Sequence, residues 1–98
     1  MRNVLEIVTY KIKQGIEIAD YLKSSKEVGE QFIMKQNGFI KHTLARSEGN
    51  EWVDVIYWKT MEDATKASEA AVQSPVCAPM FGMIDEASTK MSHFEIQN

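Results

Sequence analysis

Two extended runs separated by only two residues constrain the fold of this chain more than any other feature. Residues Phe39 to Glu48 and Glu51 to Lys59 form two extended runs, and only Gly49-Asn50 lies between them. Parallel strands need a crossover of about a dozen residues or more, so a link this short joins strands only as an antiparallel hairpin. The sequence therefore predicts two neighbouring antiparallel strands in the middle of the chain.

The segments on either side of this hairpin each combine a strand with a helix. A strand over 4–13 ends at Gln14-Gly15, and an amphipathic helix over 17–36 ends at Asn37-Gly38, where glycine suits a left-handed cap. Thr60 is placed to cap an alanine-rich second helix, and residues 87–96 form the last strand. Residues 75–85 contain two prolines and a glycine, which favours a short extra helix or an ordered loop.

The order strand, helix, strand, strand, helix, strand predicts an α+β fold of the ferredoxin-like βαββαβ type. Such a fold has a four-stranded antiparallel sheet with both helices on one face, and it places the first strand between the third and the fourth. Residues 1–98 are expected to form a single domain, because chains of this length rarely divide in two.

The other face of the predicted sheet has no helix to cover it. That face is apolar, and its residues are Leu5, Ile7, Val53, Val55 and Tyr57. A monomer would expose this surface to water, so we expect a homodimer in which a second copy covers it.

Three stretches of the chain resemble the dimeric α+β barrel superfamily, in particular its antibiotic biosynthesis monooxygenase-like (ABM-like) branch. They are Tyr10-Lys-Ile-Lys-Gln-Gly15, Gly38-Phe-Ile, and Val55-Ile-Tyr-Trp58-Lys-Thr-Met-Glu-Asp-Ala64. The resemblance covers essentially the whole chain. Gln14 stands where the family typically has proline, and Trp58 matches the family's tryptophan at the end of the third strand.

The resemblance implies a dimeric barrel of two sheets packed face to face, with small ligands bound between each sheet and its own helices. It also implies one of two functions. The first is a monooxygenase-like enzyme without a cofactor, which oxidises a small aromatic or quinol-type molecule. The second is a non-catalytic, ligand-binding or stress-responsive barrel. Haem degradation is disfavoured, because such relatives carry a histidine near the end of the second helix and residues 70–81 contain none.

Three titratable residues interrupt the apolar strands and are the candidate catalytic groups. Glu6 shares its side of the first strand with Val4 and Val8, and Asp54 and His93 lie in the third and fourth strands. With the first and third strands taken as parallel, all three residues fall near one end of the sheet. Carboxylates and an imidazole in a partly dry pocket could supply a base near neutral pH. The alternative is a solvated rim of the sheet, with His93 as a structural, hydrogen-bonded histidine.

The pocket between sheet and helices is expected to be lined by six further residues: Tyr10, Phe32, His42, Trp58, Met80 and Phe81. Each also has a purely structural interpretation. Trp58 suits packing of the second helix on the sheet, and methionine fills cores as readily as it lines ligand sites. The enzyme hypothesis requires that these side chains leave an open space rather than fill it.

Composition and charge exclude several classes of protein. The net charge is −3, the pI is about 5.3 and basic residues do not cluster, so we expect no nucleic-acid partner. No apolar run approaches the length of a membrane span, and no motif for a metal or a phosphate cofactor is present, so no membrane, metal or cofactor is expected. The single cysteine, Cys77, cannot form an intrachain disulfide, which favours the cytoplasm.

Overall fold

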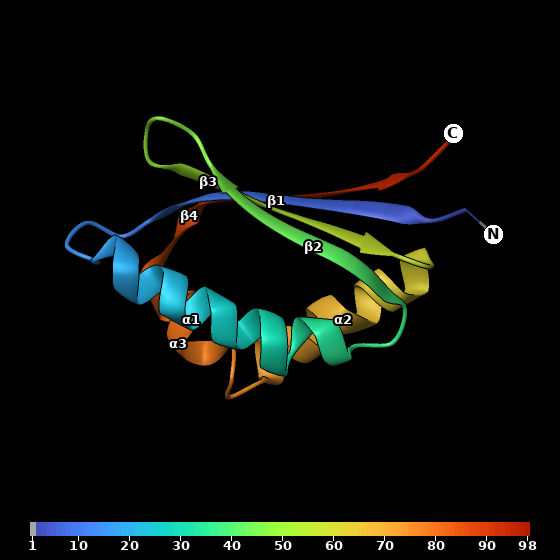
Figure 1. Cartoon of the computed structure of the whole chain (residues 1–98), viewed down its shortest axis with the longest axis horizontal. Helices are drawn as coiled ribbons and strands as arrows, with labels where there is room; N and C mark the ends of the chain where they lie inside the picture. Colours follow the sequence, from blue (N-terminus) through green and yellow to red (C-terminus); the bar gives the residue numbers. More distant parts are fainter. Residues whose placement is uncertain (1) are drawn as a thin grey trace.

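The computed structural model describes residues 2–98 and has the predicted order of strands and helices (Figure 1). The strands are β1 (Val4–Ile12), β2 (Phe39–Arg46), β3 (Glu51–Trp58) and β4 (Ile84–Glu95). The helices are α1 (Ile18–Gln31), α2 (Met61–Gln73) and α3 (Ala78–Met83), and a short 3-10 turn, η1 (Ile33–Lys35), follows α1. The sheet forms one layer and all the helices lie on one of its faces.

The strand order is β2-β3-β1-β4, and every neighbouring pair is antiparallel. This confirms that β1 lies between β3 and β4. The prediction that β1 and β3 are parallel is wrong, because α1 returns the chain so that β2 runs with β1, and the hairpin then reverses β3. As a result Asp54 is paired with Val8, whereas Glu6 is paired with Ile56.

The first helix is shorter than predicted, and the last strand starts earlier. At Phe32 the backbone leaves helical geometry, with φ −125° and ψ −64°, so α1 ends at Gln31 and η1 continues the segment. Gly38 has the predicted left-handed conformation, with φ 79°. The segment 75–85 contains the short helix α3, and β4 follows it directly at Ile84.

Two clusters of buried side chains hold the helices on the sheet. One cluster joins β1, α1 and α3 around Tyr10, Tyr21 and Trp52. The other packs Trp58 against Ala64 and Ala67 of α2, as predicted for Trp58. Thr60 caps α2, because its side chain accepts a hydrogen bond from the backbone N–H of Asp63 at 3.0 Å.

The sheet face away from the helices is not covered by any element of the described chain, residues 2–98 (Figure 1). The five apolar residues predicted on it are half-buried: Leu5, Ile7, Val53, Val55 and Tyr57. Phe94 of β4, which pairs with Leu5, is 53% exposed. The open face is therefore an apolar surface that spans at least three strands.

Candidate functional site

A cavity of about 370 Å³ lies between the sheet and the helices. Its walls include all six residues predicted to line a pocket: Tyr10, Phe32, His42, Trp58, Met80 and Phe81. Glu6 and Asp54 also line it, whereas His93 is not among its lining residues. The space that the enzyme hypothesis requires is thus present, and its volume lies within the usual range for small-molecule sites.

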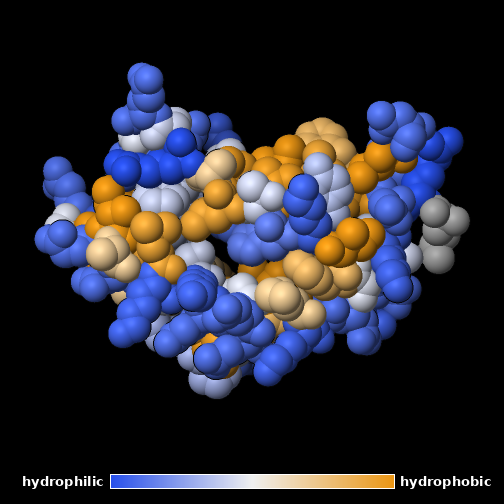
Figure 2. Space-filling view, in the orientation of Figure 1, coloured by the Kyte–Doolittle hydropathy of each residue, from blue (hydrophilic) through white to orange (hydrophobic). Residues whose placement is uncertain are grey.

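Small side chains on α2 leave room for this cavity. Ala67, Ser68 and Ala71 line it where larger residues would reach the sheet. Apolar side chains of β1, β3, β4, α1 and α3 and of the residues that follow α1 form most of the remaining wall, to which β4 also adds the polar side chains of Glu86 and Thr89. In the space-filling view, apolar side chains gather along the seam between the sheet and the helices, and the surface is hollowed there (Figure 2).

Glu6 is a buried carboxylate on the cavity wall, with only 5% of its surface exposed. The indole N–H of Trp58 donates a hydrogen bond to Glu6 Oε1 at 3.0 Å. His93 Nε2 lies 3.2 Å from the same oxygen, and its side chain is 22% exposed. Because a carboxylate only accepts hydrogen bonds, we assign the imidazole proton to Nε2 in this contact. The predicted contact between His93 and Glu6 is therefore present.

The two partners of Glu6 leave its second oxygen available. Both contacts are made by Oε1, and Oε2 has no hydrogen-bond partner among residues 2–98. Oε2 is accessible, because the one fully buried side-chain nitrogen or oxygen without a partner among residues 2–98 is Trp52 Nε1, so water or a ligand can supply a donor to Oε2. Glu6 therefore presents one fixed, acceptor-only atom at the wall of an otherwise mainly apolar cavity.

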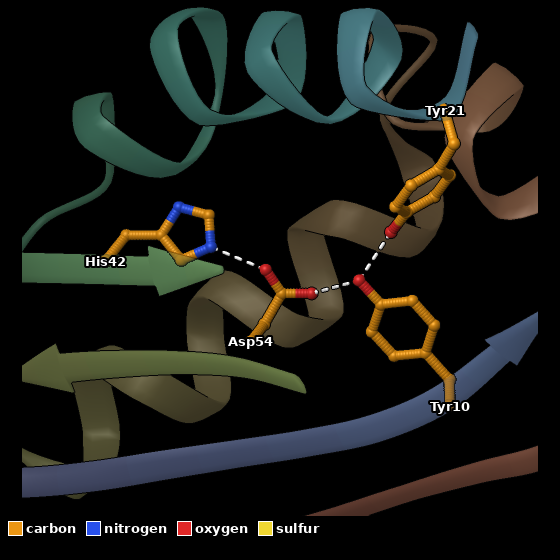
Figure 3. A network of polar contacts seen from close by, with 4 residues as sticks. All are labelled: Tyr10, Tyr21, His42 and Asp54. Carbon is orange, nitrogen blue, oxygen red and sulfur yellow. Dashed lines mark hydrogen bonds and ion pairs between the residues drawn. The ribbon is translucent and has the colours of Figure 1, made fainter. Parts of the chain in front are cut away.

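A second polar group centres on Asp54 (Figure 3). Tyr10 donates its hydroxyl proton to Asp54 Oδ2 at 2.7 Å, and the hydroxyl oxygens of Tyr10 and Tyr21 lie 2.5 Å apart. Since Tyr10 donates to Asp54, its oxygen accepts the proton of Tyr21. His42 Nε2 contacts the other carboxylate oxygen, Oδ1, at 2.5 Å. Strands β1, β2 and β3 and helix α1 each supply one member of this network.

Burial and charge keep both phenols of this network protonated. Burial, together with the negative charge of Asp54, raises the pKa of Tyr10 far above its ordinary value. Burial likewise raises the pKa of Tyr21, although its hydrogen bond with Tyr10 opposes the shift. Tyr10 is therefore a donor to Asp54, and is not a source of phenolate, at physiological pH.

Comparison with known proteins shows what this architecture resembles. No protein-family profile and no curated protein sequence matches the chain. Among solved structures, SnoaB, a cofactor-independent oxygenase from Streptomyces nogalater, aligns with a TM-score of 0.76 at 16% identity, over 100% of this chain and 96% of its own. A candidate antibiotic biosynthesis monooxygenase from Bordetella bronchiseptica aligns with a TM-score of 0.82 at 18% identity, over 100% of both chains. A conserved protein from Methanosarcina mazei aligns with a TM-score of 0.74 at 13% identity, over 99% and 95%.

The chain has the ABM-like fold. At these identities the likeness concerns the fold, so the roles of residues in this chain have to be argued from its own geometry.

The predicted meeting of Glu6, Asp54 and His93 at one place is wrong. Glu6 contacts His93, whereas Asp54 contacts His42 and Tyr10, which gives two separate polar groups on one cavity. The antiparallel pairing of β1 and β3 makes Glu6 and Asp54 diagonal neighbours. Diagonal neighbours have Cα atoms roughly 7–8 Å apart.

Tyr21 belongs to this site but was not among the predicted site residues, because it lies on the apolar face of the predicted amphipathic helix. A tyrosine on such a face still needs a partner for its hydroxyl group when it is buried, and that requirement was the available signal. The structure also buries Trp52, whose Nε1 is the one buried side-chain nitrogen or oxygen without a partner among residues 2–98.

Three further observations concern other kinds of site. No group of three or more His, Cys, Asp or Glu side chains suited to a metal ion occurs in the described chain. Among residues 2–98, no helix combines the length and hydropathy of a membrane span. Cys77 is buried and free, and burial raises the pKa of its thiol, so the reactive thiolate is disfavoured.

Proposed function

We propose that this chain is a cofactor-independent, monooxygenase-like enzyme that oxidises a small aromatic or quinol-type molecule in the cavity between sheet and helices. One observation carries the proposal: a buried carboxylate, Glu6, has an unpartnered oxygen on the wall of a mainly apolar cavity. The oxygenase activity named for the structural neighbour SnoaB supports the same reaction class.

Glu6 is suited to act as the base. Its Oε2 is available, and Trp58 and His93 hold the carboxylate through Oε1. Asp54 is less suited to this role, because both of its oxygens already accept hydrogen bonds, one from Tyr10 and one from His42.

The reaction needs no reductant other than the substrate. Glu6 takes the proton of a ring hydroxyl group, the enol form of a ring ketone that has a methylene on the opposite side of the ring, and the resulting anion, delocalised onto that opposite carbon, donates one electron to dioxygen. The two radicals combine at that carbon to form a C–O bond, and Glu6 returns its proton to give a hydroperoxide. Loss of the proton that remains on this carbon then breaks the O–O bond. One oxygen atom stays in the product as a carbonyl group, and the other leaves as water.

His93 is proposed as a positioning residue that also connects Glu6 with solvent. It lies behind Glu6 as seen from the cavity, because it contacts Oε1 but does not line the cavity. Its partly exposed ring can exchange protons with water, so it can return Glu6 to the ionised form between turnovers.

The test uses anthrone, whose ring methylene lies between two aromatic rings. The wild-type protein is expected to consume dioxygen and to form anthraquinone. General-base catalysis typically contributes about a hundredfold or more, so Glu6→Gln should lower kcat by at least that factor. Glu69→Gln makes the same change on the exposed side of α2 and should leave the rate unchanged. Equal rates for wild type and Glu6→Gln would reject Glu6 as the base.

A non-catalytic ligand-binding module would use the same cavity. It predicts saturable binding of the aromatic compound without dioxygen uptake above the rate in buffer.

We also propose a homodimer formed through the open sheet face. The support is physical: an apolar surface over β1, β3 and β4 faces away from every helix of the described chain. A second copy would cover this surface around a two-fold axis. The cytoplasm is the proposed location, in keeping with a free, buried cysteine.

A further inference from the structure

We infer that Asp54 is a second anchoring point for the ligand, and that the preferred ligand is a flat, uncharged aromatic molecule with a hydroxyl group at each of two opposite ends. The inference rests on the proposed function only in that it takes the same cavity as the ligand site. It assigns Asp54 to bind the ligand hydroxyl that does not react. Tyr10 and His42 are the positioning residues that hold Asp54.

The Asp54 end of the cavity offers hydrogen-bond acceptors. Asp54 lines the cavity and accepts from Tyr10 at Oδ2 and from His42 at Oδ1. A carboxylate has about four lone-pair positions, so about two remain for a ligand. The hydroxyl proton of Tyr10 is already given to Asp54, and the oxygen of Tyr10 is used by Tyr21. A ligand must therefore bring its own donor to this end.

The carboxylate is held in place before a ligand binds. Tyr10 and Tyr21 are almost completely buried, and their rings pack edge to face with centroids 6.0 Å apart. His42 fixes the second oxygen from the neighbouring strand β2. Groups that are already oriented lose little conformational entropy on binding, which favours a selective contact.

The wall between the two carboxylates is apolar. Val8 pairs with Asp54, Ile56 pairs with Glu6, and both line the cavity on the same face of the sheet. With the Cα atoms of Glu6 and Asp54 roughly 7–8 Å apart, an aromatic ring system can lie on this wall and direct one hydroxyl group to each carboxylate. The cavity thus has an acceptor at each end and an apolar wall between them, and the complementary ligand has a donor at each end and an apolar middle.

A neutral ligand suits this cavity better than a dication. His93 lies beside Glu6 and His42 lies beside Asp54, so each carboxylate already has a group that can carry a positive charge. The only other charged residue among residues 2–98 that lines the cavity is Glu86, which is exposed to solvent, and the rest of the wall is mainly apolar and would leave a ligand cation poorly solvated.

The test compares ligand affinities under anaerobic conditions, where no turnover occurs. The probes are a naphthalenediol with hydroxyl groups on opposite ends, its monomethyl ether, and the matching bis(aminomethyl)naphthalene. We expect the diol to bind wild-type protein about tenfold more tightly than the ether, which has a similar shape but lacks the second donor. Asp54→Asn should remove this preference, whereas Asp20→Asn on the exposed surface of α1 should retain it.

A measurement on the wild-type protein covers the case in which Asp54→Asn does not fold. Intermolecular nuclear Overhauser effects should place one end of the bound diol beside the ring of His42. Their absence in a saturated complex would contradict the inference.

Several results would overturn the inference. They are equal affinities of diol and ether, a preference for the diol that survives in folded Asp54→Asn, and tighter binding of the bis-amine. Failure of every naphthalene to bind would also reject it, together with the ligand site of the proposed function. A preference for the diol without any dioxygen uptake would support this inference and reject the enzyme.

Discussion

The indole nitrogen of Trp58 donates to a carboxylate oxygen of Glu6 at 3.0 Å, and both side chains are buried on the cavity wall. This contact joins the end of β3 to the start of β1 through side chains. It holds the carboxylate in one orientation, and the other oxygen, Oε2, stays available. Trp52, the second tryptophan, is equally buried but its indole nitrogen has no partner among residues 2–98.

These two tryptophans provide a matched pair for a stability measurement. Trp58→Phe and Trp52→Phe remove similar apolar volume, but only the first removes a hydrogen-bond donor to Glu6, whose remaining donor is His93. Hydrogen bonds to charged groups contribute about 1.5–3 kcal/mol, so we expect Trp58→Phe to lower the free energy of unfolding by roughly 1–3 kcal/mol more than Trp52→Phe. Urea denaturation measures both values. Equal losses would show that the contact with Glu6 contributes nothing.

The hydrogen bonds from Tyr21 to Tyr10 and from Tyr10 to Asp54 predict that the two tyrosines contribute differently to the free energy of unfolding. Tyr10→Phe removes the donor to Asp54 and the acceptor for Tyr21, whereas Tyr21→Phe removes only one hydrogen bond. At about 1–3 kcal/mol for each buried polar group left unsatisfied, Tyr10→Phe should destabilise the protein more. The double variant should cost less than the sum of the single variants, because they share a contact. Additive losses would argue against the hydrogen bond between Tyr21 and Tyr10.

The raised pKa values of Tyr10 and Tyr21 predict a loss of stability at alkaline pH. In the unfolded chain these phenols ionise near pH 10, whereas in the folded chain they stay protonated beyond that pH. The unfolded state therefore binds fewer protons above about pH 10, and stability falls as pH rises. The stabilising effect is complete below that value. Denaturation midpoints measured across this range should fall less steeply in Tyr10→Phe.

Replacing Gly29 or Gly38 by alanine is expected to change the stability of the protein in opposite directions. A Cβ atom at Gly29 in α1 would lie 3.7 Å from His42 Nδ1, an ordinary contact, so Gly29→Ala should stabilise the protein by about 0.5–1 kcal/mol. At Gly38, with φ 79°, a Cβ atom would overlap the side chain of Asp63. Gly38→Ala should therefore destabilise it by at least about 1–2 kcal/mol. Thermal unfolding of both variants tests the backbone and the packing of α1 against β2.

The open sheet face predicts a dimer that one charge can break. Sedimentation of the wild type at micromolar concentration should show twice the mass of the chain. Val55→Lys places a cation in the middle of the apolar face and should give the mass of one chain. Met34→Lys, an apolar-to-lysine change on the helical side, should leave the dimer intact. A monomeric wild type would reject the proposed interface.

Local patterns in the sequence were sufficient to predict the order of elements and the lining of the cavity. The short link Gly49-Asn50, the cap at Thr60 and the left-handed Gly38 are set by a few neighbouring residues, and the structure has each of them. The six predicted lining residues follow from strand alternation and from the faces of the helices.

The grouping of polar residues depended on topology and was only half predicted. His93 meets Glu6 because β4 is antiparallel to β1, as expected. Asp54 was predicted at the wrong place because β3 was expected to be parallel to β1, whereas it is antiparallel. The early end of α1 at Phe32 had only one local signal, Gly29 in the last turn of the helix, because no proline follows it and the apolar stripe continues through Phe32 and Ile33. Hydrogen bonds between distant side chains, such as that of Tyr21 with Tyr10, depend on the packed fold and have no local pattern.

The most direct test of the central claim, that an aromatic hydroxyl compound binds beside Glu6, is to follow the two indole N–H signals by NMR during a titration with β-naphthol. Trp58 lines the cavity and donates to Glu6, whereas Trp52 does not line it. We predict a saturable shift of the Trp58 signal and little change for Trp52. An unchanged Trp58 signal, or shifts confined to residues of the open sheet face such as Leu5 and Val55, would contradict the account.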